Sequence, residues 1–222
     1  MKLFLPVLSF AFFGLLASLI SAADAPKLHF EDPFSGKLDG GWKWLRERPD
    51  AWRIAGGALV IDTLPGSYWK TQNNSKNTLL RPVPVSPKDG FIIEVLLDNQ
   101  PAQQFEHAGI LLYFDGENHV ALNKEFLGKQ SLVIVSEQDG KPAVGAEKEY
   151  RGREVWLRLI VRGTRTTGQF RASETEPWQI LGDRTLPAST KELLAGIHSG
   201  YGLENPERQA RFRNFRILQA GE

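Results

Sequence analysis

The chain has 222 residues, and its 27 Lys and Arg residues nearly balance its 26 Asp and Glu residues, for a formal charge of +1. A chain with this charge balance has no excess of basic residues that would attract nucleic acid or an anionic membrane. The absence of cysteine excludes a disulfide scaffold, thiol catalysis and a cysteine-ligated metal.

The first 23 residues have the layout of a secretory signal peptide. Lys2 precedes an apolar run from Leu3 to Ile20, and the small residues from Ser21 to Ala23 follow it. We therefore expect cleavage after Ala23, a periplasmic or secreted location, and no stable membrane span in the mature protein. The alternative is a transmembrane anchor, because the run is close to the length that crosses a bilayer.

Residues 24–222 are predicted to form one all-β domain. Asp-Gly dipeptides and other turn residues separate short apolar or alternating segments, which is typical of antiparallel strands. One helical turn is expected at Lys191–Leu194. Strands are expected at Ala58–Asp62, Phe91–Leu97, Ala108–Phe114, Ser131–Ser136, Val155–Val161, Ala195–Ser199 and Gln209–Leu218.

The alternation within these segments predicts two sheets that face each other. In the segment Val155–Val161, Leu157 and Leu159 share one face, whereas Trp156 and Arg158 share the other. Burial of one face only is typical of a sheet that packs on a second sheet.

The ends of the domain and two tryptophans give further expectations for the core. Phe-rich strand signals occur at both ends, and a sandwich must pair or cover its terminal edges. We therefore expect the Phe30 region to lie beside the Phe212–Ile217 strand. Trp42 and Trp52 are assigned to the core, because a large aromatic ring packs there by default.

Several blocks follow one another in an order that resembles a known family. They are LHFEDPFSG (Leu28–Gly36), GGWKWLRERPDAWRIAGGALVI (Gly40–Ile61), YWKT (Tyr68–Thr71), EHAGILLYFDGENHVALNKE (Glu106–Glu125) and ARFRNFRIL (Ala210–Leu218). Together they resemble a concanavalin A-like family of unknown function, related to regulation-of-enolase proteins and to the C-terminal sandwich of family 43 β-xylosidases.

The resemblance implies an antiparallel two-sheet jelly-roll sandwich with a shallow concave sheet, and no established reaction. Members commonly carry a Trp and a Lys in one strand where this chain has His119 and Ala121. The chain retains Glu125 in the same strand.

We expect an exported, non-catalytic protein that binds carbohydrate on the concave sheet. A sugar ring has a face of C–H groups and an edge of hydroxyls, so aromatic rings with polar neighbours suit it. Trp69, Tyr113 and His119 are expected to stack or pack on the ring, and Glu94, Asn123 and Glu125 to bond its hydroxyls. The nominated residues are Trp69, Glu94, His107, Tyr113, His119, Asn123, Glu125 and Tyr201.

Two other functions stay open. A glycosidase or sugar-modifying enzyme would use Glu94 and Glu125, if their strands are neighbours in the concave sheet. A pocket with two close carboxylates, one of raised pKa, would favour that enzyme. Structural pairing with Arg158 or with a lysine of the sheet is the alternative for these two glutamates. A protein-interaction module without a small ligand is the third function.

No metal and no cofactor is expected. The histidines form no His-x-His or His-x-x-x-His pair, although His107, His119 and His198 could meet in space as polar members of a sugar site. A hairpin turn accounts for Asp115–Asn118 without calcium. No phosphate-binding glycine loop is present. Glu147 and Glu149 are expected to be solvated charges in a turn-like segment.

Overall fold

The computed structural model describes residues 26–70 and 72–221. The predicted signal peptide, residues 1–23, lies outside these ranges, so its cleavage stays a prediction. Within the described ranges, no helix is long and apolar enough to cross a membrane.

The regular secondary structure of the described chain is almost entirely β-strand, as the sequence predicts. One 3-10 helix covers Pro49–Ala51. The strands are β1 (Leu28–Asp32), β2 (Lys43–Leu45), β3 (Trp52–Ile54), β4 (Leu59–Asp62), β5 (Thr78–Pro82), β6 (Phe91–Asp98), β7 (His107–Asp115), β8 (Asn118–Phe126), β9 (Gln130–Gln138), β10 (Lys141–Glu149), β11 (Glu154–Arg162), β12 (Arg165–Arg171), β13 (Gln179–Thr185), β14 (Leu194–Gly200) and β15 (Gln209–Gln219).

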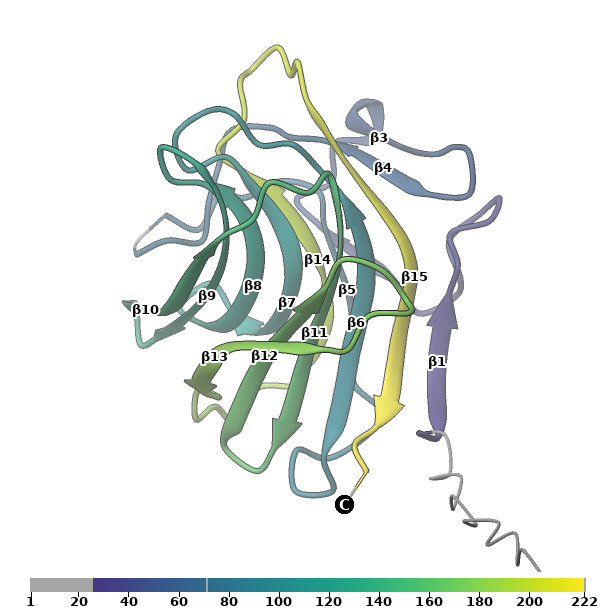
Figure 1. The fold of residues 1–222 in the computed structure, drawn as a ribbon, viewed down its shortest axis with the longest axis vertical. Helices are drawn as coiled ribbons and strands as arrows, with labels where there is room; N and C mark the ends of the chain where they lie inside the picture. Colours follow the sequence, from purple (N-terminus) through teal and green to yellow (C-terminus); the bar gives the residue numbers. More distant parts are fainter. Residues whose placement is uncertain (1–25, 71, 222) are drawn as a thin grey trace, which may run out of the picture.

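Two antiparallel sheets pack face to face (Figure 1). The eight-stranded sheet has the order β13-β12-β11-β6-β15-β4-β3, with β1 also paired to β15. The seven-stranded sheet has the order β10-β9-β8-β7-β14-β5-β2. This arrangement confirms the predicted class, an antiparallel two-sheet sandwich of the concanavalin A-like type.

The core lies between the sheets, because each strand turns alternate apolar side chains toward the other sheet. In β11, Leu157 and Leu159 are fully buried, whereas Arg158 lies on the opposite face and is partly exposed. Ile110 and Leu112 of β7 belong to the same buried cluster. The alternation in the sequence therefore predicts the inner face of these strands correctly.

The first and last strands lie side by side, as the sequence predicts. Phe30 of β1 pairs with Ile217 of β15 in antiparallel register. The Trp42 ring packs against Phe30 and Phe215, with centroid distances of 5.7 and 5.0 Å. Trp42 and Trp52 are half-buried and both pack against the core, which agrees with their predicted assignment.

The helical turn expected at Lys191–Leu194 is wrong. Leu194 is the first residue of β14 and pairs with Tyr113 of β7. Lys191 lies outside the strand and makes an ion pair of 2.8 Å with Asp115. Four residues without helical neighbours cannot offset the cost of starting a helix, and strand pairing decides the local structure.

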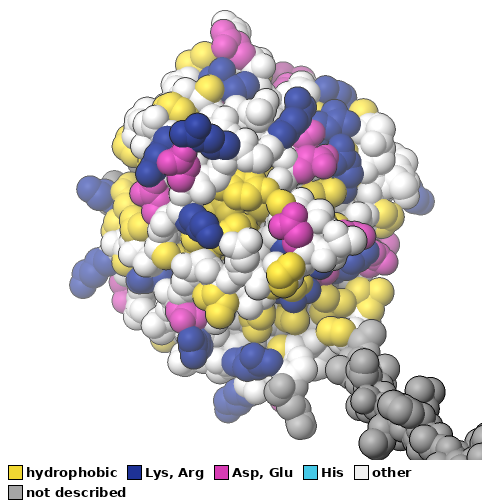
Figure 2. Space-filling view, viewed as in Figure 1, with side chains coloured by type: hydrophobic (Ala, Val, Ile, Leu, Met, Phe, Trp, Pro, Cys, Tyr) yellow, Lys and Arg dark blue, Asp and Glu magenta, His cyan; other side chains and the backbone are white. Residues whose placement is uncertain are grey.

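Charged side chains of both signs are intermixed over the face shown in Figure 2. Surface ion pairs include Arg216 with Glu31 at 2.8 Å and Arg213 with Glu154 at 2.7 Å. Exposed pairs of this kind contribute about 0–1 kcal/mol each to stability. The mixed surface agrees with the formal charge near zero.

Candidate functional site on the seven-stranded sheet

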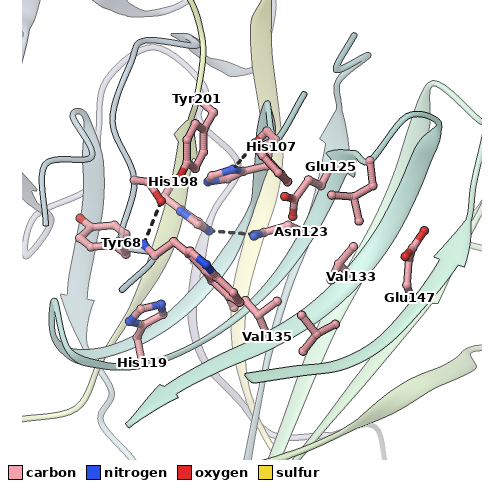
Figure 3. Close-up of a pocket in the computed structure, with 16 residues that line it drawn as sticks. Tyr68, His107, His119, Asn123, Glu125, Val133, Val135, Glu147, His198 and Tyr201 are labelled. Carbon is pink, nitrogen blue, oxygen red and sulfur yellow. Dashed lines mark hydrogen bonds between the residues drawn. The ribbon is translucent and has the colours of Figure 1, made fainter. Parts of the chain in front are cut away.

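A pocket of about 310 Å³ lies on the outer face of the seven-stranded sheet (Figure 3). Strands β7, β8, β9, β10 and β14 contribute to its walls, together with the loop before β5 and the segments that flank β7 and β14. Its lining consists of Ser67, Tyr68, Trp69, Phe105, His107, His119, Ala121, Asn123, Glu125, Leu127, Val133, Val135, Val144, Glu147, His198 and Tyr201.

Strand β8 supplies four residues of the pocket because its side chains alternate between two faces. His119, Ala121, Asn123 and Glu125 line the pocket. Their neighbour Leu122 points into the core and is fully buried. One strand therefore joins the hydrophobic core to the polar floor of the site.

A hydrogen bond crosses the floor between two strands that are not neighbours. His198 Nε2 lies 2.8 Å from Asn123 Oδ1, and both side chains are buried. Gly109 of β7 lies between them in the sheet, opposite Asn123 on one side and His198 on the other. A Cβ at Gly109 would lie 2.5 Å from Asn123 Oδ1, so only glycine leaves room for this bond.

These bonds determine which ring nitrogens of the histidines carry a proton. The amide oxygen of Asn123 only accepts, so His198 donates from Nε2 and its Nδ1 has a free lone pair. The carbonyl oxygen of Phe105 lies 2.9 Å from His107 Nδ1, so His107 donates from Nδ1 and its Nε2 has the free lone pair.

Burial keeps the three pocket histidines neutral. It lowers the pKa of His107, and it lowers the pKa of His198 well below the usual value, with smaller effects from His107 and His119. Burial also lowers the pKa of His119 to about 4. At neutral pH all three rings are therefore uncharged hydrogen-bonding groups.

Two carboxylates lie in the same pocket, Glu125 from β8 and Glu147 from β10. Burial, followed by repulsion from Glu147, raises the pKa of Glu125 to about 7. Ser131 of β9 is opposite Glu125 in the sheet and donates a hydrogen bond of 2.8 Å to Glu147 Oε1. Glu125 is therefore able to gain or lose a proton near neutral pH.

Aromatic rings form the rim of the pocket. The Phe105 and Tyr201 rings lie 5.7 Å apart, and Phe105 is 46% exposed. Both residues have positive φ, 68° and 55°, which is uncommon for large side chains and costs about 1–3 kcal/mol at each position. Backbone strain of this kind often occurs at ligand sites, and these two rim residues are among the eight non-glycine residues with positive φ in the described chain.

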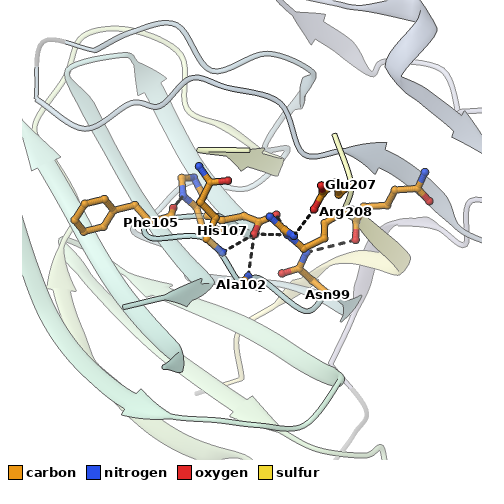
Figure 4. A network of polar contacts seen from close by, with 9 residues as sticks. Asn99, Ala102, Phe105, His107, Glu207 and Arg208 are labelled. Atoms are coloured by element: carbon orange, nitrogen blue, oxygen red, sulfur yellow. Dashed lines mark hydrogen bonds and ion pairs between the residues drawn. The ribbon is translucent and has the colours of Figure 1, made fainter. Parts of the chain in front are cut away.

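A buried ion pair holds one part of this rim (Figure 4). Glu106 lies between Phe105 and His107 in the chain and is only 1% exposed. Its carboxylate accepts hydrogen bonds from the Arg208 side chain at 2.6 Å and from the Ala102 backbone N–H at 2.9 Å. Because the carboxylate is fully partnered, it fixes the backbone on both sides of it.

Six of the eight nominated residues line this one pocket: Trp69, His107, His119, Asn123, Glu125 and Tyr201. Tyr113 lies next to it, buried behind Tyr68 with ring centroids 5.5 Å apart. Its pKa is raised to about 12, chiefly by burial.

The placement of Glu94 on the same sheet as Glu125 is wrong. Glu94 belongs to β6 in the eight-stranded sheet, where Arg158 is its direct neighbour. The two side chains form an ion pair of 2.6 Å, and Arg216 lies 3.6 Å from the other carboxylate oxygen. Glu94 is therefore a structural partner of two arginines, on the far side of the sandwich from Glu125.

Ten pocket residues were not among the nominated ones, and four of these carry an aromatic ring or a titratable group: Tyr68, Phe105, Glu147 and His198. The sequence predicts that His198 could meet His107 and His119 in space, and all three histidines line the pocket. Glu147 is exposed, as expected for a solvated charge, but the expected turn-like segment is wrong, because Glu147 belongs to strand β10 and lines the pocket. Its segment is polar, so no apolar alternation marked it as a strand.

The fold is a concanavalin A-like sandwich with a pocket on the outer face of its seven-stranded sheet. Residues 29–197 match the family described as the β-xylosidase C-terminal concanavalin A-like domain. The chain belongs to this family. No curated protein matches the chain.

Solved structures with the same fold include two from family 43. The GH43 protein BlXynB of Bacillus licheniformis is 18% identical, with a TM-score of 0.76 over 86% of this chain. The xylan β-1,4-xylosidase of Bacillus halodurans C-125 is 19% identical, with a TM-score of 0.71 over 88% of this chain. The present chain spans only 39% and 41% of those two chains.

A third similar structure has nearly the same size as the matched region. It is a functionally unknown protein from Saccharomyces cerevisiae, 18% identical, with a TM-score of 0.65. The match covers 82% of this chain and 98% of that one. At these identities the structural likeness shows the fold alone.

Proposed function

We propose that this protein is an exported, non-catalytic carbohydrate-binding protein that holds a sugar in the pocket of the seven-stranded sheet. The observation that carries this proposal is the pairing of an aromatic rim with a buried polar floor in one pocket. Its volume of about 310 Å³ falls in the range of small-ligand sites, about 300–1,000 Å³. The β-xylosidase domain family supports a carbohydrate as the ligand.

The pocket has chemically distinct surfaces for the two sides of a sugar. Trp69 and Tyr201 at the rim supply aromatic area for the C–H face of a ring. Asn123, Glu125 and the histidines supply hydrogen-bonding groups for its hydroxyls. Export rests on the signal-peptide layout of residues 1–23.

A second candidate, a glycoside hydrolase, follows from one observation. Glu125 and Glu147 share the pocket, and the pKa of Glu125 is raised to about 7. A protonated carboxylic acid beside a second carboxylate is what glycoside hydrolysis requires. This pair differs from the expected one, because Glu94 is bound to Arg158 on the other sheet.

Binding is favoured over hydrolysis because the observed features of the two carboxylates have explanations that do not require a reaction. Glu147 accepts a hydrogen bond from Ser131. Burial, followed by repulsion from Glu147, accounts for the raised pKa of Glu125. A hydroxyl or an amine of a bound sugar would donate a hydrogen bond to this carboxyl group without any reaction.

A glycan panel followed by calorimetry on two variants tests the proposal. Trp69→Ala should raise the Kd of the best glycan about tenfold, because stacking area is lost. Glu125→Gln should weaken binding less, because the amide keeps part of the hydrogen-bonding capacity. Trp178→Ala is the matched control, since Trp178 stacks on Arg158 of the other sheet, 3.8 Å from the ring centroid.

A product assay on the same proteins separates the two functions. The hydrolase candidate predicts that Glu125→Gln abolishes turnover while binding persists, because only the proton donor is removed. The binding proposal predicts no product from the wild type. If a correctly folded wild type binds no glycan, both candidates fail and an interaction module remains.

A further inference from the structure

The pocket contains several hydrogen-bond acceptors to which the protein itself donates no bond. The bonds to Asn123 and to the Phe105 carbonyl leave the lone pairs of His198 Nδ1 and His107 Nε2 free. Glu125 and Glu147 add carboxylate oxygens, which only accept when ionised. These acceptors favour a ligand that donates hydrogen bonds, and the amide N–H groups of Asn123 remain for an acceptor on the same ligand.

One of these acceptors has no partner in the protein. His198 Nδ1 is completely buried and makes no hydrogen bond, although the His198 side chain lines the pocket. His119 Nδ1 is likewise buried and makes no hydrogen bond. A buried polar atom without a partner costs about 1–3 kcal/mol, so native proteins rarely keep one without a role.

The lining supplies no positive charge to the two carboxylates. Among the residues that line the pocket in the described part of the chain, none is Lys or Arg. The three histidines are neutral at neutral pH, because burial lowers their pKa values. The charge of Glu147, and that of Glu125 when it is ionised, therefore has no cationic partner among the lining residues, while aromatic rings that attract cations lie at the rim.

We infer that the pocket binds a sugar with a free amino group, whose ammonium contacts Glu125 and Glu147 beneath the aromatic rim. This inference rests on the proposed carbohydrate binding and specifies its ligand class. An ammonium offers three donors and no acceptor, which complements the acceptors on the floor. A uronic acid brings a further carboxylate and is repelled.

Calorimetry with matched sugars tests the inference. Glucosamine, glucose and glucuronic acid share one ring and differ in charge, and the galactose series repeats the comparison with another ring. At about pH 7, where the amine is still mostly protonated and Glu125 is partly ionised, the amino sugar should bind about tenfold more tightly than the neutral sugar in at least one series. The uronic acid should bind most weakly.

Two variants test whether the carboxylates cause the preference for amino sugars over neutral sugars. Glu125→Gln and Glu147→Gln should each reduce the ratio between the amino and neutral sugars. Glu149→Gln is the matched control: it removes the same charge from β10, but Glu149 does not line the pocket and pairs with Arg151 at 2.5 Å. The ratio should be unchanged in this control.

The possible results distinguish the preference for amino sugars from the proposed binding of carbohydrate. Equal affinity for amino and neutral sugars would overturn the amino-sugar assignment and leave carbohydrate binding standing. Binding of no sugar in a wider panel would overturn both. The ¹⁵N NMR shifts of His198 provide an independent check. A proton found on Nδ1 instead of Nε2 would contradict the role of His198 Nδ1 as a hydrogen-bond acceptor.

Discussion

Gly109 allows the hydrogen bond between His198 and Asn123 to form. A Cβ at this position would lie 2.1 Å from the Leu122 carbonyl oxygen and 2.5 Å from Asn123 Oδ1. We therefore predict that Gly109→Ala lowers the free energy of unfolding by about 1–3 kcal/mol, the usual cost of overpacking. Thermal unfolding measures this change.

A second glycine provides the control for this prediction. A Cβ at Gly40 would meet no atom within 4 Å, so Gly40→Ala should leave the melting temperature nearly unchanged. If both variants unfold alike, the close approach at Gly109 has no energetic consequence.

Glu125 should make stability depend on pH in a defined direction. Burial and Glu147 raise its pKa from 4.5 to about 7 in the folded state. The folded protein then holds this proton more tightly than the unfolded chain. The stabilisation is complete below pH 4.5 and is lost as the pH rises through 7.

The difference between wild type and Glu125→Gln isolates this contribution, because glutamine does not titrate. We predict that the variant gains about 1–3 kcal/mol relative to wild type between pH 4.5 and 7. His119, whose pKa is lowered to about 4, acts in the opposite direction below pH 6.5, but it does so in both proteins. Denaturant titrations across this range would contradict the prediction if the two stability curves ran parallel.

At the level of single residues, the sequence predicts the site well where alternation operates. His119, Asn123 and Glu125 are separated by even numbers of residues in β8, so they share one face. The error at Glu94 has a different origin. Alternation shows that Glu94 points away from the core, but it does not say which of the two sheets contains its strand.

At the level of elements, two tryptophans connect the edges of the sheets. Trp44 belongs to β2 of the seven-stranded sheet and Trp52 to β3 of the eight-stranded sheet, and their ring centroids lie 4.7 Å apart. The Trp52 indole N–H also donates to Glu47 at 3.0 Å. This contact closes one edge of the sandwich.

Loss of the Trp52 ring should therefore destabilise the fold and leave the pocket intact. We predict that Trp52→Ala lowers the free energy of unfolding by about 3 kcal/mol, the lower end for a large aromatic residue because Trp52 is only half-buried. Calorimetric unfolding measures the loss, and sugar affinity should not change. Ile180→Ala is the control, since Ile180 is 69% exposed. An unchanged melting temperature in Trp52→Ala would show that the pair carries no stability.

Strands with an apolar face are predictable from the sequence, and polar edge strands are not. The expected strand Val155–Val161 corresponds closely to β11. Strand β10, with the sequence KPAVGAEKE, has mostly exposed side chains and a bulge between Val144 and Ala146. Its pairing with β9 makes it a strand, and no periodic pattern within it marks Glu147 as a pocket residue.

At the level of the whole molecule, pocket formation depends on contacts between distant parts of the chain. His198 and Asn123 are 75 positions apart, and Arg208 reaches Glu106 across 102 positions. The order of strands in each sheet brings these residues together. Local sequence patterns predict two sheets, but the strand order within them follows from the packing of the complete domain.

Mapping a bound sugar by NMR tests the central claim most directly, because it locates the ligand on the fold. The panel's best sugar is titrated into the isotope-labelled protein. We predict that amide shifts concentrate in β7, β8 and β14 and in the loop that carries Trp69, around His107, Asn123 and His198. Shifts concentrated around Trp178 on the other sheet, or no shifts with any sugar, would contradict carbohydrate binding in this pocket.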